Sequence, residues 1–167
     1  MIRLLWVAVV VSAASAALSS EAPGRGAALV APPRVGCDQV IDRNAVPPAG
    51  YRVLVGVVAA PRPHIQAVLS GNAQWPYWSK AGVGIRAGRA SVVISVPRAW
   101  RSRVAITWGN APIGSSLTIA GCPSPPHVWN GYAGGFYLRS EAECVPLAFR
   151  VGRRTAVVRF GVGRRCP

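Results

Sequence analysis

The sequence predicts an all-β fold: an antiparallel β-sandwich, Ig-like or jelly-roll-like, of about eight or nine short strands with two disulfides. Three observations support this prediction. Short runs of β-branched and aromatic residues recur along the chain, and glycine or proline separates each run from the next. Patterns with the helical period are scarce in the same region. The cysteines number four, and none of them forms a C-x-x-C pair.

The first residues of the chain are typical of an export signal. Arg3 is the first charged residue, and an uncharged, mostly apolar run follows from Leu4 to Leu18. This run contains small residues around Ala14 and Ala16, as a signal-peptidase site does. It is short for a membrane span, which favours cleavage over a permanent anchor. We therefore predict a signal peptide over residues 1–16, a secreted or cell-envelope location and no membrane span in the mature protein.

The remaining chain divides into two parts by composition. Residues 17–36 are rich in proline, glycine and alanine and show no periodicity, which predicts a flexible tether. Residues 37–167 form the predicted β-sandwich domain, which is long enough to bury a core. Nine of its segments have the composition of strands: 51–58, 65–69, 81–87, 91–96, 103–108, 115–120, 134–140, 144–151 and 155–162.

The last two segments can be aligned as a β-hairpin. Gly152 and Arg153 suit a two-residue type II′ turn because glycine comes first. In this register Phe149 pairs with Ala156, one face is wholly apolar, and the strand arginines lie on the other face. A slip of one residue would move arginine into the core, so the sequence specifies the register well.

An oxidising compartment predicts that the four cysteines form disulfides, for which three connectivities are possible. In the hairpin register Cys144 lies on the outer face, and the glycine-rich tail can return Cys166 to it. We therefore favour Cys144–Cys166, which leaves Cys37–Cys122. The cysteine spacing does not fit a zinc site, and the histidines are distant in sequence, so we expect no metal and no cofactor.

The chain is strongly basic, with 19 lysine or arginine residues against five acidic residues. All but Lys80 are arginine. This charge should attract an anionic cell-wall polymer, a glycan or an acidic protein. Codon bias in a GC-rich genome explains the arginine excess equally well. The arginines are spread along the chain and the product is exported, so we expect no specific binding to nucleic acid.

Two segments carry candidate ligand-binding residues. The segment VPRAWRSR contains guanidinium groups that can hold phosphate or carboxylate, and an indole on which they can equally stack to cover a sheet end. The segment QWPYWSK can present a flat aromatic platform of the kind that sugar-binding sandwiches display, or plug the end of the core. The candidates are Arg98, Trp100, Arg101 and Arg103 in the first segment, and Trp75, Tyr77 and Trp78 in the second.

Catalytic patterns are weak. The chain has no G-x-S-x-G and no H-E-x-x-H motif. Asp38 and Asp42 beside Cys37, and Glu141 and Glu143 beside Cys144, can supply an acid–base pair, but more simply they neutralise arginines. The sequence therefore predicts a secreted, non-catalytic binding or structural module at the cell envelope. A secreted hydrolase that uses these carboxylates, and a protein–protein interaction module, are the alternatives.

The segment WNGYAGGFYLRSEAECVPLAFRVGRRTAVVRFGVGRRC, from Trp129 to Cys166, resembles the C-terminal part of small secreted proteins of unknown function from high-GC Gram-positive bacteria. A weaker similarity lies in VVISVPRAWRSRVAITWG. The resemblance implies export and two cysteines near the C-terminus. It implies no activity and no site residue.

Overall fold

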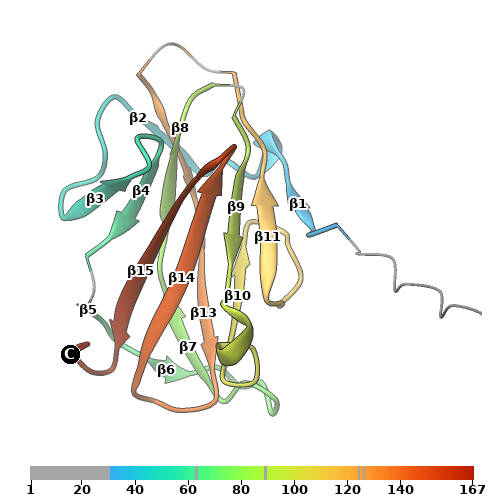
Figure 1. The fold of residues 1–167 in the computed structure, drawn as a ribbon, viewed down its shortest axis with the longest axis vertical. Helices are drawn as coiled ribbons and strands as arrows, with labels where there is room; N and C mark the ends of the chain where they lie inside the picture. Colours follow the sequence, from blue (N-terminus) through green and yellow to red (C-terminus); the bar gives the residue numbers. More distant parts are fainter. Residues whose placement is uncertain (1–30, 63, 89, 124, 126) are drawn as a thin grey trace, which may run out of the picture. The chain divides into compact units, whose positions relative to one another are not determined.

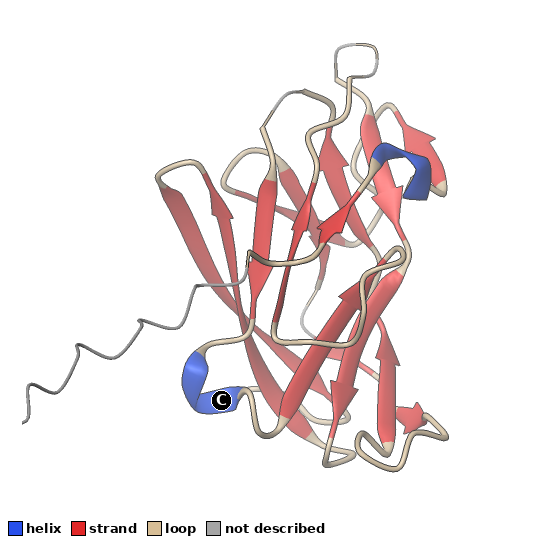
Figure 2. Ribbon diagram, turned by 90° about the vertical axis from the view of Figure 1, so that its right-hand side faces the viewer, coloured by secondary structure: helices blue, strands red, loops and turns tan. Residues whose placement is uncertain are grey.

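A computed structural model describes residues 31–167 except residues 63, 89, 124 and 126. This part of the chain is all-β (Figure 2). It has fifteen strands, two single-turn 3-10 helices and two disulfides. None of its helices is long and apolar enough to cross a membrane. The predicted signal peptide and most of the predicted tether lie outside the described residues.

The strands form three sheets (Figure 1). The six-stranded sheet has the order β1 (Arg34–Val35), β11 (Ser116–Ile119), β9 (Val92–Ser95), β14 (Glu143–Val151), β15 (Arg154–Val162) and β5 (His64–Ile65). The four-stranded sheet has the order β10 (Val104–Trp108), β13 (Gly134–Leu138), β7 (Tyr77–Lys80) and β6 (Val68–Leu69). The five-stranded sheet has the order β2 (Asp42–Asn44), β12 (Trp129–Tyr132), β8 (Val83–Arg86), β4 (Val58–Pro61) and β3 (Tyr51–Leu54).

The two smaller sheets meet end to end. Strand β7 leads into β8 after two residues, and β12 leads into β13 after one. A hydrogen bond from the amide of Ala81 to the carbonyl of Gly134, 2.8 Å long, continues the pairing across the junction. The antiparallel registers β12–β8 and β13–β7 therefore make one long ribbon, and alternate residues along it keep to the same face.

One core connects the six-stranded sheet with this ribbon and its neighbours. The ring of Phe136 in β13 lies 5.3 Å from that of Phe160 in β15, and 6.0 Å from that of Trp108 in β10. All three side chains are almost fully buried. The buried indole of Trp108 donates a hydrogen bond to the carbonyl of Ala81, at 2.8 Å. The three rings thus connect the two sheets through the core, and the indole nitrogen is satisfied.

The predicted C-terminal hairpin is confirmed. Strands β14 and β15 pair with Phe149 opposite Ala156, and Val151 opposite Arg154, so Gly152 and Arg153 form the two-residue loop. Gly152 has φ +57°, whereas Arg153 is not among the residues with positive φ, as a type II′ turn requires. The inward side chains of β14 are buried, and Arg150 is exposed on the opposite face.

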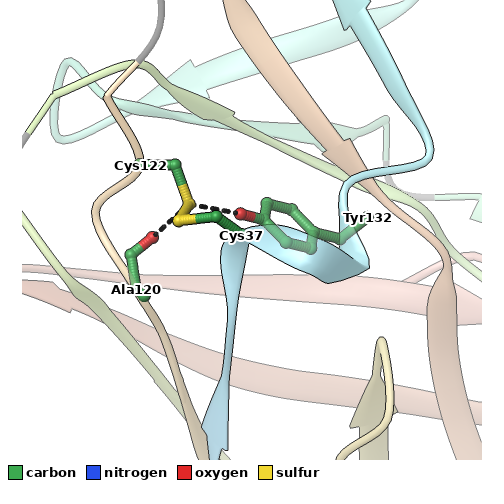
Figure 3. Close-up of a disulfide and its surroundings, with 4 residues drawn as sticks. All are labelled: Cys37, Ala120, Cys122 and Tyr132. Atoms are coloured by element: carbon green, nitrogen blue, oxygen red, sulfur yellow. Dashed lines mark hydrogen bonds between the residues drawn. A yellow bond between two sulfur atoms is a disulfide. The ribbon is translucent and has the colours of Figure 1, made fainter.

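Both predicted disulfides are also confirmed. Cys144–Cys166 joins the start of β14 to the C-terminal tail. Cys37–Cys122 joins a 3-10 turn, η1 (Cys37–Gln39), to the segment after β11. Figure 3 shows the Cys122 sulfur beside the hydroxyl of Tyr132. The two atoms are 3.2 Å apart. A disulfide sulfur carries no proton, so the tyrosine hydroxyl is the donor in this contact.

The strand count and the number of sheets were predicted wrongly: three sheets with fifteen strands replace a sandwich of eight or nine strands. Segment 51–58 is not one strand but the hairpin β3–β4, because Val55 (φ +45°) and Gly56 (φ +79°) form a turn. Segment 65–69 contributes only the short strands β5 and β6. Strands β1, β2, β7 and β12 were not predicted as strands.

Strand β1 lies within the predicted tether. It pairs in parallel with β11, and Val35 is fully buried. The six-stranded sheet therefore extends into the segment that was predicted as a tether, where the buried side chain of Val35 anchors an edge strand. The sequence also predicts that VPRAWRSR lies on or beside a hairpin loop between segments 91–96 and 103–108, which is wrong. It crosses from β9 in the six-stranded sheet to β10 in the four-stranded sheet.

Candidate functional site

The crossing between β9 and β10 holds the first group of predicted ligand-binding residues. It contains the 3-10 turn η2 (Arg98–Trp100), which lies at the lower end of the domain in Figure 1. Arg98 is exposed, and Trp100 is half-buried against the core. The guanidinium carbon of Arg103 lies 4.5 Å from the centre of the Trp100 ring. Arginine and indole therefore stack on each other at this sheet end, which was one of the two arrangements expected.

Arg103 is also committed to an ion pair. Its Nη2 donates to both carboxylate oxygens of Glu143 at 2.7 Å, and its Nε donates to one of them at 3.2 Å. The side chain of Glu143 is only 7% exposed, whereas that of Arg103 is 53% exposed. A buried carboxylate needs such a partner. Arg103 therefore fixes the start of β14 beneath η2, and its donors are largely used within the protein.

Arg101 has a different environment. It lines a hollow of about 260 Å³ together with Trp75, Asn72 and Gln74. We call this the arginine–indole hollow. The Nε of Arg101 donates to the carbonyl of Val96 at 3.2 Å, which fixes the direction of the side chain. Its terminal nitrogens have no partner among the described residues. They are free to bind an anion in a defined place.

Trp75 forms the inner wall of this hollow. Its side chain is 7% exposed, and the guanidinium carbon of Arg139 lies 5.2 Å from its ring centre. The side-chain oxygen of Asn72 accepts hydrogen bonds from the amides of Gln74 and Trp75, at 2.9 and 3.1 Å, and so fixes the turn before β7. The two predicted groups thus meet here through Arg101 and Trp75.

The proline in QWPYWSK predicts a broken loop, but the other two aromatic candidates, Tyr77 and Trp78, lie in strand β7. Trp78 faces outward, where its ring is 4.7 Å from that of Tyr137 in β13 and tilted by 47°. Tyr77 faces the other way and packs on the core, opposite Leu138. The three aromatic side chains of QWPYWSK therefore do not form one flat platform. Trp78 and Tyr137 make a smaller half-exposed pair on the outer face.

The sequence did not reveal a larger groove on the outer face of the five-stranded sheet, about 400 Å³ in volume. Its floor is glycine backbone from β8, from β12 and from the β7–β8 junction. Its walls are mostly apolar, with residues such as Ile41, Pro48 and Ile65, and a few polar groups lie among them. A side chain on Gly131 would collide with the carboxylate of Asp42, and one on Gly82 would come within 3.2 Å of the Tyr51 hydroxyl. The lining residues used below are Asp42, Asn44, Tyr51, Lys80 and Trp129.

The polar side chains of this groove include negatively charged, positively charged and neutral groups. The side-chain amide of Asn44 donates to Asp42 at 3.0 Å. Burial, and secondarily the negative charge of Asp42, raises the pKa of Tyr51, so its hydroxyl stays protonated and able to donate. Lys80 adds an ammonium group. Such a mixture suits a ligand with several hydroxyl groups. Gly82 and Gly84, spaced two apart in the predicted strand segment 81–87, were the signal available in the sequence.

The predicted carboxylates do not converge. Strand β2, which carries Asp42, lies at the upper end of the domain in Figure 1, and the start of β14, which carries Glu143, lies at the lower end. Asp38 accepts a hydrogen bond from its neighbour Gln39, at 2.7 Å. The imidazole of His127 contacts a guanidinium, that of Arg86, at 2.8 Å. Within the described ranges no three His, Cys, Asp or Glu residues are grouped as a metal site requires.

No family model, no curated protein and no solved structure matches this chain.

Proposed function

We propose that this domain is a non-catalytic binding module of the cell envelope that binds an anionic saccharide polymer at the arginine–indole hollow. The observation that carries the proposal is the state of Arg101. Its Nε is anchored by a backbone carbonyl, and its terminal nitrogens point to no partner among the described residues. A guanidinium held in this way is preorganised for a carboxylate.

The surroundings of Arg101 add recognition of a sugar. Asn72 and Gln74 supply side-chain amides, and Trp75 supplies an indole edge. Amides donate to and accept from hydroxyl groups, and aromatic surface packs against the C–H groups of a pyranose. A uronic acid combines a carboxylate with hydroxyl groups. It therefore matches the hollow better than a simple anion or a neutral sugar does.

The charge of the whole chain supports a polymeric ligand. The formal net charge is +14, and the only ion pair within the described part is Arg103–Glu143. Most guanidinium groups are therefore not neutralised within the protein. A polyanion would be attracted over roughly one Debye length, about 8–10 Å at physiological salt, and this attraction weakens as salt rises.

The groove on the five-stranded sheet supports a second contact for a saccharide. Asp42, Asn44 and Tyr51 offer carboxylate, amide and hydroxyl groups around a glycine floor. A neutral sugar unit of the same polymer would suit this groove, since it presents hydroxyl groups without requiring a charge partner.

The proposal can be tested with polygalacturonate as the anionic polymer and a neutral glucan as the reference. We expect the protein without its predicted signal peptide to bind polygalacturonate in preference. Arg101→Gln should weaken this binding about tenfold, because a charge-assisted hydrogen bond contributes roughly 1.5–3 kcal/mol. The matched control is Arg153→Gln, which removes the same charge at the exposed β14–β15 turn. It should weaken binding less than about twofold.

Three results would contradict the proposal. Equal effects of the two variants would mean that net charge alone attracts the polymer. Preferential binding of the neutral glucan would move the primary site to the groove. Release of sugar from either polymer, abolished by Asp42→Asn, would favour the secreted hydrolase.

A further inference from the structure

A second hollow lies near the C-terminus, outside the arginine–indole hollow and the groove. It has a volume of about 340 Å³ and is lined by Arg62, His64, Arg159, Arg165 and Cys166. We call it the tail hollow. Three of its five lining residues are arginine and one is histidine. Among the residues that the structure describes, no acidic residue lines it.

Three connections in the fold bring these residues together. Strand β5 pairs in parallel with β15, with His64 opposite Gly161, which places the end of the β4–β5 connection beside the hairpin. Arg159 projects from the outer face of β15, because its neighbours Val158 and Phe160 point into the core. The Cys144–Cys166 disulfide returns the tail to this face. Figure 1 shows the C-terminus beside β5 and the end of β15.

The positive charges of the tail hollow are not compensated within the described part of the chain. None of its arginines has a carboxylate partner there, in contrast to Arg103. Like charges gathered around one hollow repel one another, which costs free energy in the free protein. A bound anion removes this repulsion, so the arrangement favours a ligand with more than one negative oxygen.

We propose that the tail hollow binds a phosphoryl group, as the free ion or as an ester. A single carboxylate has two oxygens and one charge, which one guanidinium fork can satisfy. A phosphate has more oxygens and up to two charges, and it can therefore accept hydrogen bonds from several arginines at once. The residues around the tail hollow offer guanidinium donors from three separate segments of the chain.

This site is independent of the proposed saccharide site. Its residues come from β15, from β5 with the connection before it, and from the tail, and Arg101 and Trp75 are not among them. The phosphoryl site can therefore exist whether or not the domain binds a polyuronate.

The test measures binding of inorganic phosphate to the protein by calorimetry and by shifts of arginine side-chain NMR signals. Glycerol phosphate serves as the monoester, a glycerophosphodiester as the diester, and acetate as the carboxylate reference. We expect phosphate and its monoester to bind more tightly than acetate. Arg159→Gln should weaken phosphate binding about tenfold, as expected for loss of one charge-assisted contact.

The matched control is Arg150→Gln, which removes the same charge from the same face of the same hairpin. Arg150 lies opposite Thr155 near the turn, and it is not among the residues that line the tail hollow. This variant should change phosphate affinity less than twofold. Arg159→Gln should change the affinity for polygalacturonate less than twofold relative to the wild-type protein. Arg101→Gln should likewise change the affinity for phosphate less than twofold.

A second variant tests the role of the disulfide. Replacing Cys144 and Cys166 by serine releases the tail that carries Arg165, and phosphate affinity should fall at least fivefold while circular dichroism shows a folded protein. Equal weakening by Arg159→Gln and Arg150→Gln would overturn the proposal, since net charge would then explain the binding. Absence of phosphate binding, or equal binding of acetate, would overturn it as well.

Discussion

The two disulfides of this domain close chain segments of different length and serve different parts of the molecule. Cys37–Cys122 spans 85 residues, and Cys122 lies buried beside Tyr132 (Figure 3). Cys144–Cys166 spans 22 residues and holds the C-terminal tail against the outer face of the hairpin. We expect both bridges to stabilise the fold, the first more than the second. The second also fixes the tail that carries Arg165, which lines the proposed phosphoryl site.

The largest expected effects are the losses of stability on removing either bridge, and these two losses should differ. Chain-entropy arguments give about 4–5 kcal/mol for the longer loop and about 3 kcal/mol for the shorter. The double variant Cys37→Ala/Cys122→Ala should therefore lose more free energy of unfolding than Cys144→Ala/Cys166→Ala. Urea denaturation of both variants at neutral pH measures this. A larger loss in the second variant would contradict this order.

The region of the second bridge could be predicted from the sequence because its contacts are local. The strands β14 and β15 are joined by two residues, and only one register keeps Arg150 and Arg159 out of the core. That register places Cys144 on the outer face, within reach of the tail. Hydrophobic alternation and turn chemistry act at short range. The sequence therefore predicts both the β14–β15 pairing and the Cys144–Cys166 disulfide.

The region of the first bridge could be predicted only in part. Strand β12 pairs with β2 and β8, which are far away in sequence, and no short-range pattern specifies such partners. The glycines that floor the groove look like strand breakers in the sequence, but here they make room for Asp42 and Tyr51. The Cys37–Cys122 disulfide could be predicted only because pairing Cys144 with Cys166 left no other partner. The groove could not be predicted, because its walls come together only through long-range strand pairing.

A smaller effect distinguishes the two acidic residues beside the second bridge. Glu143→Gln removes the charge that holds Arg103, and it should lower the free energy of unfolding by about 2 kcal/mol. This loss is smaller than expected for a fully buried ion pair because Arg103 is half-exposed. Glu141 is exposed, and Glu141→Gln should cost less than about 0.5 kcal/mol. Thermal and urea unfolding of the two variants measure the difference. Similar losses would mean that Glu143 contributes only general charge balance.

The smallest effect belongs to the tyrosine beside the first bridge. Burial raises the pKa of Tyr132 above its usual value of about 10; nearby Asp38 adds to this shift, and Arg43 opposes it. The folded protein therefore holds the phenolic proton more tightly than the unfolded chain does. This contribution to stability is complete below pH 10 and is lost as pH rises through the raised pKa.

Tyr132→Phe separates this titration from the hydroxyl contact with Cys122. At neutral pH the variant should lose about 1 kcal/mol, because the hydroxyl no longer donates to the sulfur. As pH rises above 10, the wild-type protein should lose stability faster than the variant, and the two free energies of unfolding should converge. Tyr51→Phe is the control at a site away from the bridge, where burial and Asp42 also raise the pKa. Parallel curves for wild type and Tyr132→Phe would show that the proton of Tyr132 has no part in holding the first bridge in the core.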